Sequence, residues 1–200
     1  MSIHEHRRTE HEIDTLFVSR WSTRAFSGEE ITDAELFSVL EAARWAPSGG
    51  NVQPWRFIYA KRHSPAWPAF LGFLNEGNRR WADKAAALIL LTSRTTRDRG
   101  DGSGQQPLRS HSFDAGAAWS NLAHQARLQG LSTRAIGGFD QDSARREVGV
   151  PPDHALEIVI ALGRPDANKS GLPDDLREKD VPNDRLPLAA LVAADRFSFA

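Results

Sequence analysis

The 200-residue chain contains no cysteine, and methionine and tyrosine occur once each. Without cysteine the protein cannot form disulfides, use a thiol nucleophile or bind a metal through thiolates. The absence also fits a reducing compartment. The longest apolar run, residues 85–91, is far too short to cross a bilayer, and no apolar segment follows the charged N-terminus as it would in a signal peptide. We therefore expect a cytoplasmic protein without a membrane partner.

The chain also lacks a large excess of charge of either sign. It has 25 Lys and Arg residues against 26 Asp and Glu residues, a formal net charge of -1. Such a balance gives no broad attraction to nucleic acid. Hydrophobic residues make up 40% of the 200 positions, which is ordinary for a globular protein with one sizeable core. No repeat or linker divides the chain, so we predict a mobile polar tail at residues 1–10 and a single domain at residues 11–200.

Several common catalytic and binding motifs are absent as well. Gly100, Gly102 and Gly104 do not form the dinucleotide fingerprint, because Gln105 occupies the next required glycine position and no strand precedes them. His124 belongs to no supported Ser/His/Asp arrangement, and its simplest interpretation is a packed or surface side chain. The histidines near the N-terminus lack the spacing of a zinc motif: His4, His6 and His11. We predict no metal site.

The most informative stretch that is present runs from Trp45 to Tyr59. Pro47 disfavours a helical backbone at the residue before it, so a preceding helix should end at Ala46. Residues 48–51 are Ser-Gly-Gly-Asn, which suit a turn and close approach of the backbone by a ligand. The apolar run that follows Pro54 predicts a buried strand. These residues fit a binding edge on rigid supports and an ordinary helix-to-strand connection equally well.

A second stretch places two arginines four positions apart, Arg20 and Arg24, with Ser22 and Thr23 between them. Planar guanidinium groups and small hydroxyls together form a good cradle for a phosphate or another anion. A solvated charged loop would have the same composition. On the pattern alone, the solvated loop is the favoured interpretation.

Hydrophobic periodicity predicts the surrounding elements. Thr32 and Glu35 form a capping box at the start of a helix. Residues 94–110 carry scarcely any apolar side chain and predict a long exposed loop, either a functional lid or a disordered segment. The other predicted elements are short helices at residues 13–20, 65–75 and after Asp140 or Asp142, a long central helix from Ser112 or Asp114 to Gly130, strands at 55–61, 86–91 and 155–163, and a closing segment at 185–192.

Four stretches match one family pattern in the correct order. They are Arg20-Trp21-Ser22-Thr23-Arg24-Ala25-Phe26, Glu41-Ala42-Ala43 leading into Ala46 to Trp55, Asp114 to Ala118 with Asn121-Leu122, and Ile136-Gly137-Gly138 before a strand that ends at Gly163. The pattern Ala-Pro-Ser-x-x-Asn-x-Gln-Pro-Trp is met from Ala46 to Trp55 without a mismatch, which makes it specific. By these motifs the chain resembles the FMN-dependent nitroreductase family over residues 13–192.

The resemblance implies both a fold and a cofactor. The fold would be α+β, a mostly antiparallel sheet flanked by helices, assembled as an intertwined homodimer with FMN at each dimer interface. The residues that would bind FMN are, by position, Arg20, Trp21, Ser22, Arg24, Pro47, Ser48, Gly49, Asn51, Asn78, Ile136, Gly137, Gly138 and Arg185.

Within this set the resemblance implies distinct roles. Arg20 and Arg185 would hold the phosphate, with Ser22 near the phosphate and the ribityl chain. Arg24 would reach the pyrimidine edge of the flavin. The two glycines after Ile136 would offer backbone N–H groups near flavin N5 and O4. The Pro-Ser-Gly turn, supported by Asn51, would pack on the flavin of the partner chain.

The resemblance also implies a reaction. NAD(P)H would give a hydride to the flavin and leave, and a nitroaromatic, quinone or enone would then take the electrons in a ping-pong sequence. No side chain has to act as a nucleophile, because the cofactor carries the redox chemistry. Two alternatives stay open: an oxidase, dehalogenase or reductive ring-cleavage enzyme of the same superfamily, or a flavin-binding protein without turnover.

The chain departs from the family pattern at two positions. Asn183 replaces the lysine of the closing Lys-x-Arg motif, and Trp81 replaces a lysine that commonly follows the flavin-contacting asparagine. Arg24 is therefore expected to supply the positive charge at the pyrimidine edge alone. The alternative is that Arg24 lies in solvent and pairs with Glu29 or Glu30.

Overall fold

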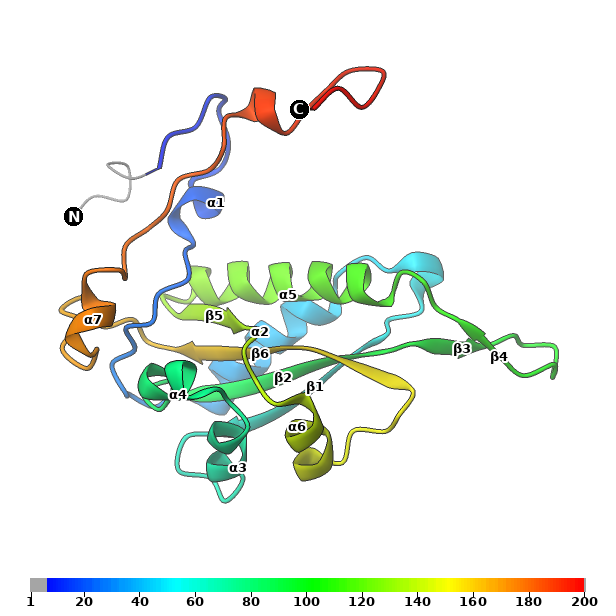
Figure 1. Cartoon of the computed structure of the whole chain (residues 1–200), viewed down its shortest axis with the longest axis horizontal. Coiled ribbons are helices and arrows are strands. Elements are labelled where there is room, and N and C mark those ends of the chain that lie inside the picture. Colours follow the sequence, from blue (N-terminus) through cyan, green and yellow to red (C-terminus); the bar gives the residue numbers. More distant parts are fainter. Residues whose placement is uncertain (1–6, 200) are drawn as a thin grey trace.

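The computed structural model describes residues 7–199 (Figure 1). The elements in chain order are α1 Thr15–Ser19, α2 Asp33–Arg44, η2 Gly49–Asn51, β1 Trp55–Lys61, α3 Trp67–Gly72, α4 Glu76–Ala82, β2 Ala87–Arg94, β3 Thr96–Asp98, β4 Gln105–Pro107, α5 His111–Leu128, β5 Ser132–Ile136, α6 Gln141–Val148, β6 His154–Gly163, α7 Asp174–Arg177 and η3 Leu188–Ala190. The strands do not follow the regular β-α-β alternation that is typical of parallel α/β folds.

The four main strands form one antiparallel sheet in the order β1-β2-β6-β5. Strand β2 lies at the centre and pairs with β1 on one side and β6 on the other, with one register shift between Leu91 and Thr92. The predicted strands at 55–61, 86–91 and 155–163 correspond to β1, β2 and β6. The prediction of an α+β fold with a mostly antiparallel sheet is confirmed.

Strand β2 is apolar on both faces because helices cover both sides of the sheet. Leu88 and Leu90 pack in a core with α3, α4 and α6. Ile89 and Leu91, which point to the opposite face, pack in a second core with α2 and α5. Figure 1 shows α5 on one side of the sheet and α3 and α6 on the other. The run of consecutive apolar residues in β2 therefore reflects a three-layer arrangement, with the sheet between two layers of helices.

Helix α2 begins at the predicted capping box. The Thr32 hydroxyl accepts the Glu35 N–H at 3.1 Å, and the Glu35 carboxylate accepts the Thr32 N–H at 2.8 Å. The hydrogen bond from the Thr32 backbone lowers the pKa of Glu35 despite some desolvation, and Arg164 lowers it further. Two of the N–H groups that a helix start leaves unpaired are satisfied in this way.

The prediction of a long exposed loop at residues 94–110 misses two paired strands, although most of the segment is exposed. Strands β3 and β4 form a hairpin in which Thr96 pairs with Pro107 and Asp98 with Gln105. Its tip contains three glycines with positive φ, at positions 100, 102 and 104, and such backbone conformations favour glycine. The hairpin is polar and exposed, so its pairing leaves no apolar alternation in the sequence.

Helix α4 is a further difference from the sequence-based expectation, which left its residues unassigned. Trp81 on this helix is 1% exposed and stacks on Phe26, with ring centroids 6.2 Å apart. Trp81 is thus a core residue.

The N- and C-terminal segments run side by side away from the sheet (Figure 1). The Glu10 carboxylate accepts the Leu188 N–H at 2.7 Å, so part of the predicted tail contacts the end of the chain. Residues 1–6, with His4 and His6, lie outside the described residues, and their mobility stays a prediction.

We expect Thr32→Ala to lower the free energy of unfolding by about 1 kcal/mol, the usual cost of losing an N-cap. Thr32→Ser is the matched control, because it keeps the hydroxyl that accepts the Glu35 N–H. Urea denaturation followed by circular dichroism measures both. Equal losses in the two variants would show that the cap is not the source of the effect.

Candidate functional site

The segment from Arg20 to Arg24 is fixed by a buried carboxylate. Asp180, 1% exposed, accepts the Thr23 hydroxyl and the Arg24 N–H, both at 2.7 Å. The Thr23 hydroxyl in turn accepts the Ala25 N–H at 2.9 Å. Both oxygens of Asp180 thus accept hydrogen bonds, as a buried polar group requires. The C-terminal segment thereby holds the backbone of the predicted arginine motif in place.

Arg7 joins this region to both ends of the chain. Its Nη1 donates to the carbonyl oxygens of Val18 at 2.7 Å and Arg20 at 2.6 Å. Its Nε donates to the carbonyl oxygen of Asn183 at 3.0 Å. The sequence analysis missed Arg7, because nothing in the polar stretch around it marks a site.

Three guanidinium groups crowd together here: Arg7, Arg20 and Arg185. Burial lowers the pKa of Arg20, and Arg185 lowers it further. Burial also lowers the pKa of Arg7, as do Arg185 and Arg20, and only Asp184 opposes them. Repulsion between like charges disfavours this arrangement unless an anion joins it. The donor set fits a phosphate group, which guanidinium groups bind through paired hydrogen bonds.

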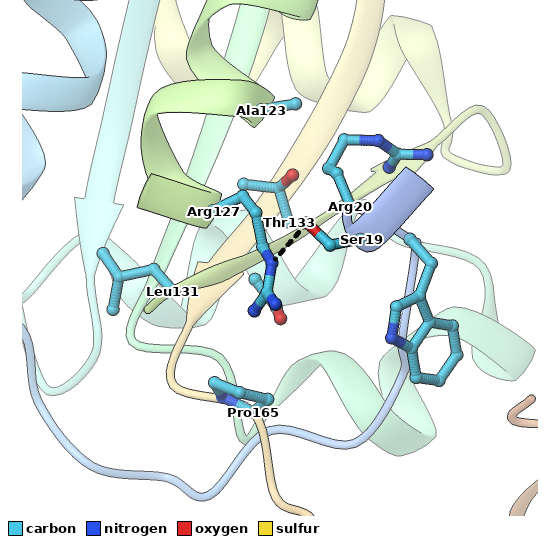
Figure 2. Close-up of a pocket in the computed structure, with 9 residues that line it drawn as sticks. Ser19, Arg20, Ala123, Arg127, Leu131, Thr133 and Pro165 are labelled. Atoms are coloured by element: carbon cyan, nitrogen blue, oxygen red, sulfur yellow. Dashed lines mark hydrogen bonds between the residues drawn. The ribbon is translucent and has the colours of Figure 1, made fainter. Parts of the chain in front are cut away.

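A small cavity lies beside Arg20 (Figure 2). Its volume is about 70 Å³, and it is lined by Ser19, Arg20, Trp21, Ala123, Arg127, Leu131, Ser132, Thr133 and Pro165. Arg127 Nε donates to the Ser19 hydroxyl at 3.1 Å. The Thr133 hydroxyl is buried and has no hydrogen-bond partner within residues 7–199. This cavity can take water or a small polar group but not a ring system.

A more open hollow of about 250 Å³ lies over the C-terminal half of α5. It is lined by Arg20, Ser22, Trp119, Ser120, Ala123, His124 and Ala135. Arg20 Nη1 donates to the Ser22 hydroxyl at 3.3 Å, so these two predicted residues lie together. The rings of His124 and Phe17 meet in an edge-to-face contact, with centroids 5.2 Å apart, which agrees with the interpretation of His124 as a packed or surface side chain.

The turn after β5 is hydrogen-bonded to the first turn of α4. Asn78 Nδ2 donates to the Gly138 carbonyl oxygen at 3.0 Å, and the Asn75 N–H donates to the same oxygen at 3.1 Å. Ile136 is buried, whereas Gly137 is exposed. The backbone N–H groups of the two glycines have no acceptor within the described part of the chain. They are available to a ligand.

The turn from Pro47 to Asn51 lies elsewhere, at the N-terminal end of α5. The Gly49 N–H donates to Asp114 at 3.2 Å, and the Ser110 hydroxyl donates to the same carboxylate oxygen at 3.0 Å. The Ser48 hydroxyl accepts the Gln53 N–H at 3.0 Å. Asp114, which was not predicted as a site residue, therefore anchors this turn.

Helix α5 separates the predicted site residues into two groups. Asp114 holds the Pro47 turn, while Ala123 lines the hollow beside Arg20 and Ser22. Nine helical residues correspond to about 14 Å along the axis. Figure 1 shows the η2 turn and α1 at opposite ends of α5. One chain does not bring the two groups together.

Two other kinds of site are not observed. Within residues 7–199, no three His, Cys, Asp or Glu side chains are placed to hold a metal ion. In the same range, the helices are all too short or too polar to span a membrane.

Comparison with known proteins identifies similar chains. A sequence model of the nitroreductase family matches residues 18–66 and 60–164. A crystal structure described as an oxidoreductase containing FMN has a TM-score of 0.94 and 42% identity, with 97% of each chain covered. A nitroreductase family protein from Clostridium difficile 630 has the same fold, with a TM-score of 0.70, 22% identity and coverage of 94% of this chain and 100% of the other. NADH dehydrogenase from Thermus thermophilus is 24% identical over an alignment of 204 positions that covers 89% of this chain and 93% of the relative.

We expect Gly138→Ala to destabilise the turn after β5 and Gly137→Ala to leave stability unchanged. A Cβ on Gly138 would lie 2.8 Å from Asn78 Nδ2, whereas a Cβ on Gly137 meets nothing within 4 Å. Moving Asn78 breaks its bond to the Gly138 carbonyl, a loss of about 0.5–1.5 kcal/mol. Urea denaturation of the two variants checks the difference. Equal stabilities would show that Asn78 can move without cost.

Proposed function

The chain belongs to the nitroreductase family, and from this premise we propose that it is an FMN-dependent oxidoreductase that uses NAD(P)H to reduce electron-poor acceptors in the cytoplasm. The observation that carries the proposal is the crowding of three guanidinium groups at one end of a site whose other end offers unpaired backbone N–H groups. FMN matches both ends, with a terminal phosphate and a ring whose polar edge accepts hydrogen bonds. FMN is the cofactor.

The residues at the phosphate end fit FMN rather than FAD. Arg7, Arg20 and Arg185 provide a compact positive cluster for one terminal phosphate. The dinucleotide fingerprint that would hold a pyrophosphate is absent from the sequence. The Ser22 hydroxyl, bound to Arg20 at 3.3 Å, would lie beside the phosphate and the ribityl chain. Asn183 stands where the family pattern has a lysine. Arg7, which donates to the Asn183 carbonyl oxygen, adds a positive charge at this position.

The residues at the ring end would orient the flavin. The N–H groups of Gly137 and Gly138 would donate to the N5 and O4 side of the ring, and Ile136 anchors their turn in the core. Asn78 is already bound to the Gly138 carbonyl, so it would hold the turn as well as border the flavin. When bound, FMN supplies the transfer of two electrons from NAD(P)H to a nitroaromatic, quinone or enone. The two substrates would use the same open face in turn, which is a ping-pong order.

We further propose that the chain works as an intertwined homodimer. The Pro47 turn cannot reach the hollow of its own chain along α5, but a two-fold axis would bring it to the hollow of a partner. Large apolar side chains are exposed on the terminal segments and around both ends of α5: Ile13, Phe17, Trp45, Phe113, Leu128, Leu186, Leu188, Leu191, Val192 and Phe197. Obligate dimers bury surfaces of this kind, on the order of 2,000 Å² or more.

The purified protein should carry one FMN per chain, and anaerobic NADH or NADPH should bleach its visible absorption. Heat release and chromatography identify the flavin. Recovery of FAD, or no uptake of FMN by the flavin-free protein, would contradict the proposed cofactor. FMN that neither NADH nor NADPH reduces would indicate a flavin-binding protein without turnover. Reduction that is reversed by oxygen but by no nitroaromatic, quinone or enone would indicate an oxidase.

Subunit complementation should show that the Pro47 turn acts across the dimer. Arg20→Ala and Gly49→Trp should each prevent FMN binding, because they damage the phosphate end and the covering turn respectively. After the two variants are unfolded together and refolded, half of the dimers are mixed, and each mixed dimer has one intact site. About one quarter of the sites should then bind FMN.

The controls are each variant refolded alone and the wild-type chain refolded alone. Sedimentation should give a dimer for all samples. No recovery of binding in the mixture, while the wild type recovers, would mean that the turn serves its own chain.

A further inference from the structure

Strand β5 places Arg134, an arginine that was not predicted as a site residue, beside the predicted flavin residue Ser22. Arg134 donates to the carbonyl oxygen of Ser22, and its guanidinium carbon lies 5.6 Å from the centroid of the Trp81 ring. Trp81 is buried and stacked on Phe26, so it forms a rigid platform. A guanidinium over an indole face gains a cation–π interaction. The hydrogen bond and the platform together hold the positive charge of Arg134 in one position.

Among residues 7–199, Arg134 forms no ion pair with a carboxylate. Burial lowers the pKa of Arg134, the neighbouring Arg24 lowers it further, and Asp180 opposes them. Asp180, however, is occupied: its two oxygens accept the Thr23 hydroxyl and the Arg24 N–H. Two guanidinium groups thus share one carboxylate that is bound to neutral donors. The neighbourhood keeps an excess of positive charge.

The position of this charge follows from the elements that surround it. Ser22 belongs to the segment proposed to hold the phosphate and the ribityl chain. Trp81 lies one helical turn after Asn78 on α4, and residues three apart share a helix face. Asn78 in turn binds the Gly138 carbonyl. Arg134 therefore lies between the phosphate end and the ring end of the site.

We propose that Arg134 and Arg24 act as a pair that sets positive charge against the pyrimidine edge of the flavin and favours its reduced form. The inference rests on the proposed function. Uptake of two electrons and one proton leaves one negative charge on the flavin, spread over N1 and the C2 carbonyl. A fixed cation at that edge stabilises the charge as it forms. The expectation that Arg24 acts alone is replaced by a shared role.

The test measures the midpoint potential of bound FMN in Arg134→Gln, by titration against a reference dye. The ratio of affinities for reduced and oxidised FMN should fall about tenfold, which equals a shift of about 30 mV to more negative potential. Arg134→Lys, which keeps the charge, should stay within about threefold of the wild type. Arg146→Gln is the matched control, because it removes a positive charge from an exposed side chain on α6 and should leave the potential unchanged.

A structural role for Arg134 predicts a different result. If the side chain only steadied the Ser22 carbonyl, Arg134→Gln would weaken oxidised and reduced FMN equally and the potential would not move, which overturns the proposal. Should Arg134→Gln fail to fold, Arg134→Met takes its place, because its stem can still cover Trp81. A wild-type chain that takes up no FMN would contradict the proposed function itself, whereas FMN binding with an unchanged potential in the variants contradicts only the role of Arg134.

Discussion

The rest of the structure depends on the burial of β2 on both of its faces. Burial of each leucine or isoleucine of β2 stabilises the fold by about 1.5–3 kcal/mol. Because these side chains point to both faces of the sheet, their burial requires a layer of helices on each side. Leu88 and Leu90 thereby fix the layer that contains α4, and Ile89 and Leu91 fix the layer that contains α5. The candidate site lies where these two layers meet the edge strand β5. Its residues come from the segments that leave the layers, which is where binding groups are commonly found.

A local excess of positive charge is the second constraint, and the net charge of -1 conceals it. The guanidinium groups form two clusters of like charge, Arg7 with Arg20 and Arg185, and Arg24 with Arg134. The buried carboxylate nearest to them, Asp180, is bound to a hydroxyl and a backbone N–H. Repulsion between these charges therefore destabilises the folded protein, and a bound anionic ligand would offset that repulsion. The electrostatics of the candidate site and the anionic phosphate of FMN are complementary in this sense.

The length of α5 links the fold to the proposed assembly. Its 18 residues carry the anchor of the Pro47 turn at one end and the wall of the hollow at the other. A rigid helix of this length keeps the two groups apart, since each residue adds about 1.5 Å. In the proposed dimer, the site would be completed by residues of both chains. The same assembly would cover the apolar side chains that are exposed on the terminal segments.

The sequence by itself determined the features that depend on near neighbours. The capping box at Thr32, the end of α2 before Pro47 and the apolar strand β1 all follow from residues a few positions apart, and the motif from Ala46 to Trp55 indicated the family. The β3–β4 hairpin escaped prediction because its polar strands leave no periodic signal. Only the tertiary structure decided which further residues join the site. Arg134 reaches Ser22 across 112 positions and Arg7 reaches Asn183 across 176, and contacts over such separations depend on how the layers pack, which no local pattern records.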